Sequence, residues 1–239
     1  AITTFHLHPL LSVVLAVVVS TLLGVVIEKV AYTPLRSAPR LSLLITAIGI
    51  SFLLENGAQL IFGADSKSMD PMVTGNLSVG GISISYAALI TILVSVAAML
   101  LLTFLVQGTK LGKAMRAVSE DMGAAQLMGI NINKTISFTF AVGSALAGIG
   151  SVLYMCAYPQ ASPTMGSMLG LKAFVAAVLG GIGSIPGAVI GGFAIGMAEA
   201  LVSAAGLSVW KDGVVFAILI VVLLVKPTGI LGRPITEKV

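Results

Sequence analysis

The chain has 239 residues, of which 57% are hydrophobic and 9% are charged, and its mean hydropathy is +1.10. A soluble domain carries about 25% charged residues because its surface faces water, so this composition excludes a soluble globular protein and predicts a surface that faces lipid. The net charge of +4 does not indicate nucleic-acid binding, because the basic residues flank apolar runs, where they set membrane orientation. The runs are continuous, whereas a β-barrel would alternate. The expected fold class is all-α: a polytopic helical membrane protein with about six to seven transmembrane or re-entrant helices.

Uncharged runs long enough to cross the ~30 Å hydrocarbon core as helices define the predicted spans. The first four are 10–27, 41–62, 86–106 and 135–157. Short loops rich in Lys and Arg stay in the cytoplasm, so we expect the connections 28–40 and 107–134 inside. The connections 63–85 and 158–167 are then expected outside, together with the N-terminus. The basic tail after Val225 is expected inside.

The last predicted span, 213–225, is short, and the chain is expected outside both before residue 168 and near Lys211. The stretch between must therefore cross and return, or dip in and out of the membrane. Residues 180–187, Gly-Gly-Ile-Gly-Ser-Ile-Pro-Gly, break a helix, which predicts helices at 168–180 and 187–205. The first would be about 20 Å long, too short for a full crossing. A re-entrant pair and a plain helical hairpin both remain open.

Motifs for catalysis, nucleotides or metals are not found. Residues 108–114 have three rather than four residues between their glycines, and Ala rather than Ser or Thr follows the second lysine, so the phosphate-loop pattern fails. No metal-ligand spacing is present, and the two histidines, His6 and His8, are expected to be exposed near the N-terminus. The single cysteine, Cys156, is expected to pack. We therefore expect no cofactor and no metal in this chain.

Three ionisable residues lie in or near the spans. Such residues face a protein interior or a wet cavity, because a charge in lipid is unfavourable. Glu55 and Lys172 lie near predicted span ends, which favours a structural or snorkelling role. For Glu199 a pathway lining and a structural polar lock are both left open.

Glycines concentrate in the stretch that follows residue 180. Gly181 and Gly183 belong to the predicted turn. Gly187 and Gly191 form one GxxxG pattern, and residues 192–196 form a second. Such faces let helix backbones approach closely in lipid, so we expect tight packing within the subunit or against a partner, and we take these glycines as packing or pathway positions.

The polar connection between the third and fourth spans predicts one amphipathic helix over 113–128. Its apolar stripe is Met115, Val118, Met122 and Ala125. Arg116 and Glu120 share another face with Asp121 beside them, and Gly129 is a stop signal. The helix is expected to seat in a groove on a soluble partner. The alternative is a helix on the membrane surface, against which its acidic residues argue.

Several stretches resemble known permeases. Ala124-Ala125-x-x-x-Gly129 resembles the cytoplasmic coupling motif of ABC importer permeases, with Gly123 where that motif has Glu. Longer stretches resemble the branched-chain amino-acid permeases of the LivH type. They are 28–36 (Glu-Lys-Val-Ala-Tyr-Thr-Pro-Leu-Arg), 112–117 (Gly-Lys-Ala-Met-Arg-Ala), 170–184 (Gly-Leu-Lys-Ala-Phe-Val-Ala-Ala-Val-Leu-Gly-Gly-Ile-Gly-Ser) and 186–188 (Pro-Gly-Ala). The resemblance covers nearly the whole chain. It implies one permease domain over 1–239 containing the coupling loop 107–134, with two further apolar segments expected ahead of it.

The resemblance also implies a function and partners. The chain would be the membrane-spanning subunit of an ATP-binding-cassette importer that carries leucine, isoleucine and valine across the bacterial inner membrane. Two ATPase subunits would bind the ATP, a second permease subunit, identical or homologous, would complete the path, and a periplasmic or extracellular binding protein would deliver the amino acid. The residues implied at the ATPase contact, within a coupling helix over 113–129, are Arg116, Glu120, Asp121, Ala124, Ala125 and Gly129. A permease for urea or a sugar, an ATP-independent transporter or channel, and an intramembrane enzyme remain alternatives.

Overall fold

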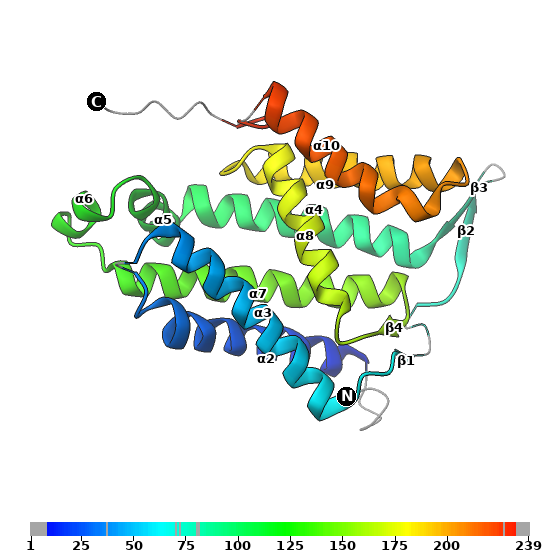
Figure 1. Ribbon diagram of the computed structural model, residues 1–239, viewed down its shortest axis with the longest axis horizontal. Helices are drawn as coiled ribbons and strands as arrows, with labels where there is room; N and C mark the ends of the chain where they lie inside the picture. Colours follow the sequence, from blue (N-terminus) through cyan, green and yellow to red (C-terminus); the bar gives the residue numbers. More distant parts are fainter. Residues whose placement is uncertain are drawn as a thin grey trace. The chain divides into compact units, whose positions relative to one another are not determined.

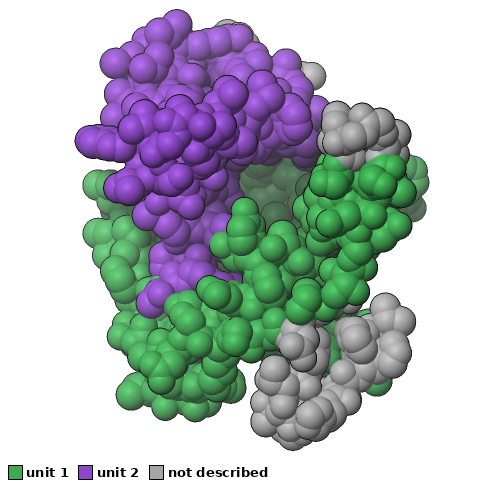
Figure 2. All heavy atoms as spheres, turned by 90° about the vertical axis from the view of Figure 1, so that its right-hand side faces the viewer, with its two compact units in different colours: residues 1–163 green, residues 164–239 purple. Residues whose placement is uncertain are grey.

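The computed structural model describes residues 9–36, 38–69, 71, 73–79, 82–226 and 228–232. The chain divides into two compact units, unit 1 (residues 1–163) and unit 2 (residues 164–239), which Figure 2 distinguishes by colour. In the described residues, six helices are long and apolar enough to cross a membrane. They are Leu11–Tyr32, Leu41–Phe62, Tyr86–Gly108, Ile132–Ala157, Ile185–Ala204 and Ser208–Val225. The predicted class, a polytopic all-α membrane protein, is confirmed.

Unit 1 contains four of these spans. Its long helices are α2 (Pro9–Ile27), continued by the π-helix η1 (Glu28–Tyr32), α3 (Arg40–Phe62), α4 (Tyr86–Gly108) and α7 (Ile132–Ala157). Small residues bring α2 and α7 together. A β-carbon at Gly148 would lie 3.0 Å from Cα of Val17, and Ser20 Oγ donates to the Ser144 carbonyl at 2.8 Å. Backbones approach closely at such positions because no side chain separates them.

Four short strands lie at one end of unit 1 (Figure 1). Strand β1 (Lys67–Ser68) pairs antiparallel with β4 (Gln160–Ala161), which places the two connections expected outside at the same end. Strands β2 (Asn76–Val79) and β3 (Ile82–Ser85) form a hairpin. The sequence analysis treated 63–85 as a connection and predicted no strand in it. Alternating apolar residues around Gly80 and Gly81, which lie outside the described residues, were the signal for a hairpin.

Unit 2 is a three-helix arrangement. It contains α8 (Met165–Gly180), α9 (Ile185–Ala204), the 3-10 turn η2 (Ser208–Trp210) and α10 (Lys211–Val225). Its core holds one buried side chain from each helix: Val175, Ile195 and Val215. Because these side chains are almost fully removed from contact with the surroundings, they fix the three helices side by side.

The turn between α8 and α9 lies at the same end of unit 2 as the end of α10. Ile230 N donates to the Leu179 carbonyl and Leu231 N to the Gly180 carbonyl, both at 2.9 Å, so the segment after α10 satisfies acceptors that the end of α8 leaves free. The two helices pack against each other as a pair, but α8 is shorter than the six candidate spans, so the re-entrant pair and the full hairpin both stay predictions. The 16 residues of α8 span about 24 Å, starting three residues earlier than predicted.

Candidate functional site

The polar connection of unit 1 begins with a sharp reversal from α4 into α5 (Lys110–Glu120). Thr109 caps α5, because its Oγ1 accepts from Gly112 N at 3.0 Å. A β-carbon at Gly112 would lie 2.3 Å from the carbonyl oxygens of Leu105 and Val106. Only glycine fits this close approach, which folds α5 back against the end of α4.

The single helix predicted over 113–128 is wrong: the structure has two helices, α5 and α6 (Met122–Leu127). Asp121 separates them with an extended backbone (φ −153°, ψ 110°). Its carboxylate accepts from Ala124 N at 3.0 Å and so caps α6. Aspartate is a poor residue inside a helix and a good one at its start, because its short side chain competes for backbone N–H groups. The break divides the predicted apolar stripe: Val118 and Ala125 are buried, and Met122 is 56% exposed.

Most residues predicted to contact an ATPase lie on the surface of this connection. Exposed positions are Arg116, Glu120, Asp121, Ala124 and Gly129, whereas Ala125 is buried. Gly129 follows α6 with φ +81°, a backbone conformation that favours glycine. The sequence analysis missed two apolar side chains of this connection that are highly exposed, Leu127 at 91% and Met128 at 82%.

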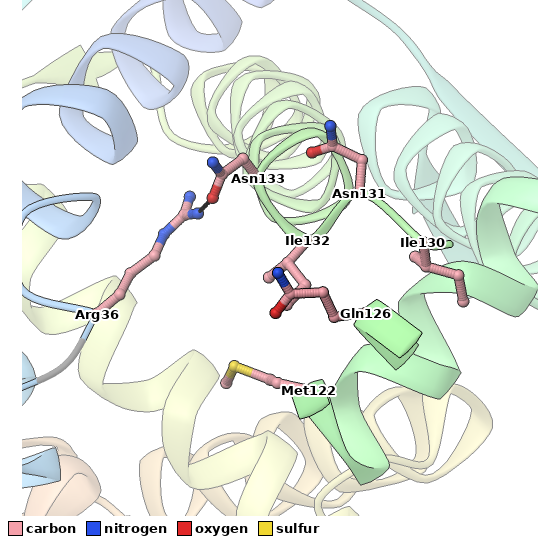
Figure 3. A pocket seen from close by; sticks show the side chains of 7 residues that line it. All are labelled: Arg36, Met122, Gln126, Ile130, Asn131, Ile132 and Asn133. Atoms are coloured by element: carbon pink, nitrogen blue, oxygen red, sulfur yellow. Dashed lines mark hydrogen bonds between the residues drawn. The ribbon is translucent and has the colours of Figure 1, made fainter. Parts of the chain in front are cut away.

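A groove of about 400 Å³ lies beside α6, lined by residues of α6, the start of α7 and the turn before α3 (Figure 3). Its lining residues are Arg36, Met122, Gln126, Ile130, Asn131, Ile132 and Asn133. Asn131 caps α7, because its Oδ1 accepts from Lys134 N at 3.1 Å. Ile130 N donates to the Ala125 carbonyl at 3.0 Å, which ties the segment before α7 to α6.

A buried carboxylate lies at the same end of unit 1. Glu28 begins the π-helix η1 and its side chain is fully buried. Its two oxygens accept from Ser137 Oγ on α7 at 2.6 Å and from Thr33 Oγ1 at 3.0 Å, and Arg36 pairs with it. An isolated buried charge is unfavourable by several kcal/mol, so such a group needs a partner and further hydrogen bonds. Single-turn π-helices occur often at functional sites.

Arg36 links this carboxylate to the groove. One of its Nη atoms donates to Glu28 and the other donates to Asn133 Oδ1 in the first turn of α7, as Figure 3 shows for the Asn133 bond. The sequence analysis named neither Glu28 nor Arg36 as a functional residue. The available signals were a carboxylate at the end of an apolar span and the 28–36 stretch that carries the family resemblance.

Unit 2 has an ionic cluster of its own. Lys172 Nζ on α8 lies 2.7 Å from Glu199 Oε1 on α9 and 2.7 Å from Asp212 Oδ1 on α10. One ammonium group therefore joins all three helices of the unit. This geometry favours the polar lock over the pathway lining for Glu199. Glu55 is half-buried on α3, and its role stays a prediction.

The first glycine pattern packs within the subunit. β-Carbons at Gly187 and Gly191 would lie 2.4 Å and 2.2 Å from carbonyl oxygens of α8. In the second pattern, Gly192 makes one ordinary contact and Gly196 has nothing within 4 Å. Gly181 and Gly183 have φ of +107° and +92° in the turn. Ser184 caps α9 by accepting from Gly187 N at 3.2 Å.

Among the described residues, no group of three or more His, Cys, Asp and Glu side chains could hold a metal. His6 and His8 lie outside that part of the chain.

Six apolar helices among the described residues, one buried and one partly exposed ionic cluster, and the polar helices α5 and α6 at one end of unit 1 are typical of a multi-pass membrane protein of the transporter-permease class. The chain belongs to the family described as the permease component of the branched-chain amino acid transport system, whose family model matches residues 1–223.

Comparison with curated proteins gives the same family. The chain is 46% identical over 230 residues to the high-affinity branched-chain amino acid transport system permease protein LivH of Salmonella typhimurium, covering 94% of this chain and 74% of that protein. It is 44% identical over 229 residues to the corresponding permease protein BraD of Pseudomonas aeruginosa, covering 94% and 75%. The xylose transport system permease protein XylH of Escherichia coli is 33% identical over 107 residues, 39% of this chain and 27% of that protein. No solved structure matches.

Proposed function

We propose that this chain is the membrane-spanning permease subunit of an ATP-driven importer that carries leucine, isoleucine and valine across the inner membrane. The observation that carries the proposal is the 46% identity, over 94% of the chain, to a permease named for branched-chain amino acid transport. The likeness to a xylose permease covers 39% of the chain. It favours a shared permease architecture and leaves the solute to be decided by experiment.

ATP hydrolysis in this importer belongs to two separate ATPase subunits, which bind the nucleotide. The failed phosphate-loop pattern at 108–114 supports this division. The projection formed by α5 and α6 is the contact, with Leu127 and Met128 as its apolar anchors and Arg116 and Glu120 as exposed charges nearby. A second permease subunit and an external amino-acid binding protein complete the assembly. This chain itself performs no catalysis and carries no cofactor.

Uptake into proteoliposomes tests the solute. The full-length permease is purified with its co-expressed transport subunits, and ATP-dependent uptake of labelled leucine is measured against excess isoleucine, valine, xylose or urea. Isoleucine and valine are expected to compete, and xylose and urea are not. Competition by xylose alone, or leucine uptake that persists without ATP, would contradict the proposal.

The coupling contact is tested separately by recovery of the ATPase with the permease. Leu127→Asp places a charge at the apolar tip and is expected to abolish co-purification, because the anchor must be desolvated in the interface. Ser119→Asp is the matched control, since it places the same charge on an exposed side chain of α5 rather than at the end of α6. Loss of the ATPase from both variants, or from neither, would contradict the assignment of this tip.

A further inference from the structure

The cluster around Glu28 is more elaborate than the burial of one carboxylate requires. Hydrogen bonds from Ser137 and Thr33, at 2.6 Å and 3.0 Å, already satisfy both oxygens of the carboxylate. Arg36 adds the compensating charge. A lysine at this position would supply that charge as well, because an ammonium group is also a cation. What the ammonium lacks is the planar fork with two separate Nη groups.

The two Nη groups of Arg36 donate to acceptors on two different helices. Nη2 of Arg36 pairs with Glu28, which lies in η1 near the end of the first membrane span, and Nη1 donates to Asn133 in the first turn of α7. The guanidinium is planar and rigid, so the two acceptors are held at a fixed separation. Ser137, on the same helix as Asn133, holds the other oxygen of Glu28. The cluster therefore fastens η1 to the first turns of α7 at two points.

The start of α7 is also where the projection joins the membrane helices. Ile130 N is bonded to the Ala125 carbonyl of α6, and Asn131 caps α7. Asn133 follows two residues later and lines the groove that faces Met122 and Gln126 of α6. Ile130, Asn131 and Ile132 therefore connect α6 to Asn133, with Ile130 hydrogen-bonded to α6 and Asn131 hydrogen-bonded to α7. A displacement of α6 is transmitted to Asn133 through these three residues.

We propose that Arg36 is a positioning residue that latches the first span to α7 through Asn133, so that a displacement of α6 moves both helices together. This inference rests on the proposed function, because the displacement is the one that an ATPase bound to the projection produces. Arg36 touches no solute in this role. It acts by keeping the ends of two helices in register while the force is transmitted.

The test uses Asn133, whose side chain is exposed and contributes little to packing. Asn133→Leu keeps the size and removes the acceptor, Asn133→Asp keeps an acceptor for Arg36, and Lys134→Gln is the control for an adjacent exposed polar side chain. Solute uptake and ATP hydrolysis are both measured on the full importer in proteoliposomes. The readout is the number of solute molecules carried per ATP hydrolysed.

Asn133→Leu is expected to lower this ratio about tenfold, equivalent to roughly 1.4 kcal/mol, while ATP hydrolysis continues. Asn133→Asp and Lys134→Gln are expected to retain the ratio, and Arg36→Lys is expected to behave like Asn133→Leu. An unchanged ratio in Asn133→Leu, an equal loss in Asn133→Asp, or failure of Asn133→Leu to assemble would overturn the latch while leaving the proposed function intact. If the wild type shows no ATP-dependent uptake, the proposed function falls and the latch falls with it.

Discussion

Gly191 is a position where a single methyl group should directly disturb the packing of α9 on α8. A β-carbon there would lie 2.2 Å from the Ala176 carbonyl oxygen and 3.0 Å from Gly180 N. The first distance is 0.8 Å short of the 3.0 Å below which β-carbon contacts essentially never occur. The atoms that the added β-carbon would meet are backbone atoms of α8, so the clash can be avoided only if α8 and α9 separate. Overpacking of this kind destabilises by about 1–3 kcal/mol.

The matched control is Gly196→Ala, one turn further along α9, where a β-carbon would meet nothing within 4 Å. In a helix interior, Ala is favoured over Gly by about 0.5–1 kcal/mol, so this variant is expected to be neutral or slightly more stable. Both variants are purified in detergent, and the fraction that remains monodisperse is followed with temperature. Gly191→Ala should lose monodispersity at a lower temperature than the wild type, and Gly196→Ala should not. Equal midpoints for the two variants would refute the close packing of α8 on α9.

Two further substitutions probe the polar contacts. Asp121→Ala removes the cap of α6 and should destabilise this helix by about 1 kcal/mol. The measurement is amide hydrogen exchange in 122–127, which should become faster. The control is Ser119→Ala, which removes only an exposed hydroxyl bonded to the Arg116 carbonyl and should leave that exchange unchanged. Lys172→Met leaves the carboxylates of Glu199 and Asp212 without their shared ammonium group and should destabilise unit 2 by roughly 1–2 kcal/mol, less than for a fully buried pair because the three side chains are partly exposed. The thermal midpoint should recover when Glu199→Gln and Asp212→Asn are added. A midpoint that does not recover would contradict the structural role of this ion cluster.

The membrane helices could be predicted from the sequence because lipid imposes a simple condition: long uncharged runs must form helices that satisfy their own backbone groups. The predicted limits of α3 and α4 agree with the structure to within two residues. The break at Asp121 could not be found in the same way. The apolar period continues through it, and the competition between a helix interior and a helix cap is decided by local backbone hydrogen bonds.

The ionic clusters were beyond prediction for a different reason. Glu28 and Ser137 are separated by 109 positions in the chain, and Lys172 meets its two partners only after three helices have packed. Each residue alone is compatible with a solvated or snorkelling side chain. Whether such a residue forms a buried ion pair depends on which helix faces pack together. Small residues such as Gly148 determine that packing, because they set how closely two helices approach. A pattern of apolar residues in the sequence does not contain those distances.

The two kinds of contact between α2 and α7 have different mechanical consequences. The close approach at Gly148 and Ser144 holds the helices together along their length but resists sliding weakly, since dispersion contacts re-form after a shift. The charged cluster at Glu28 resists sliding strongly, because its hydrogen bonds have fixed directions and a buried carboxylate deprived of them is unfavourable. In contrast, the apolar windows of α3 and α4 have no buried residues within the chain. We therefore expect the α2–α7 pair to move as one body, and we expect α3 and α4 to face lipid or another subunit.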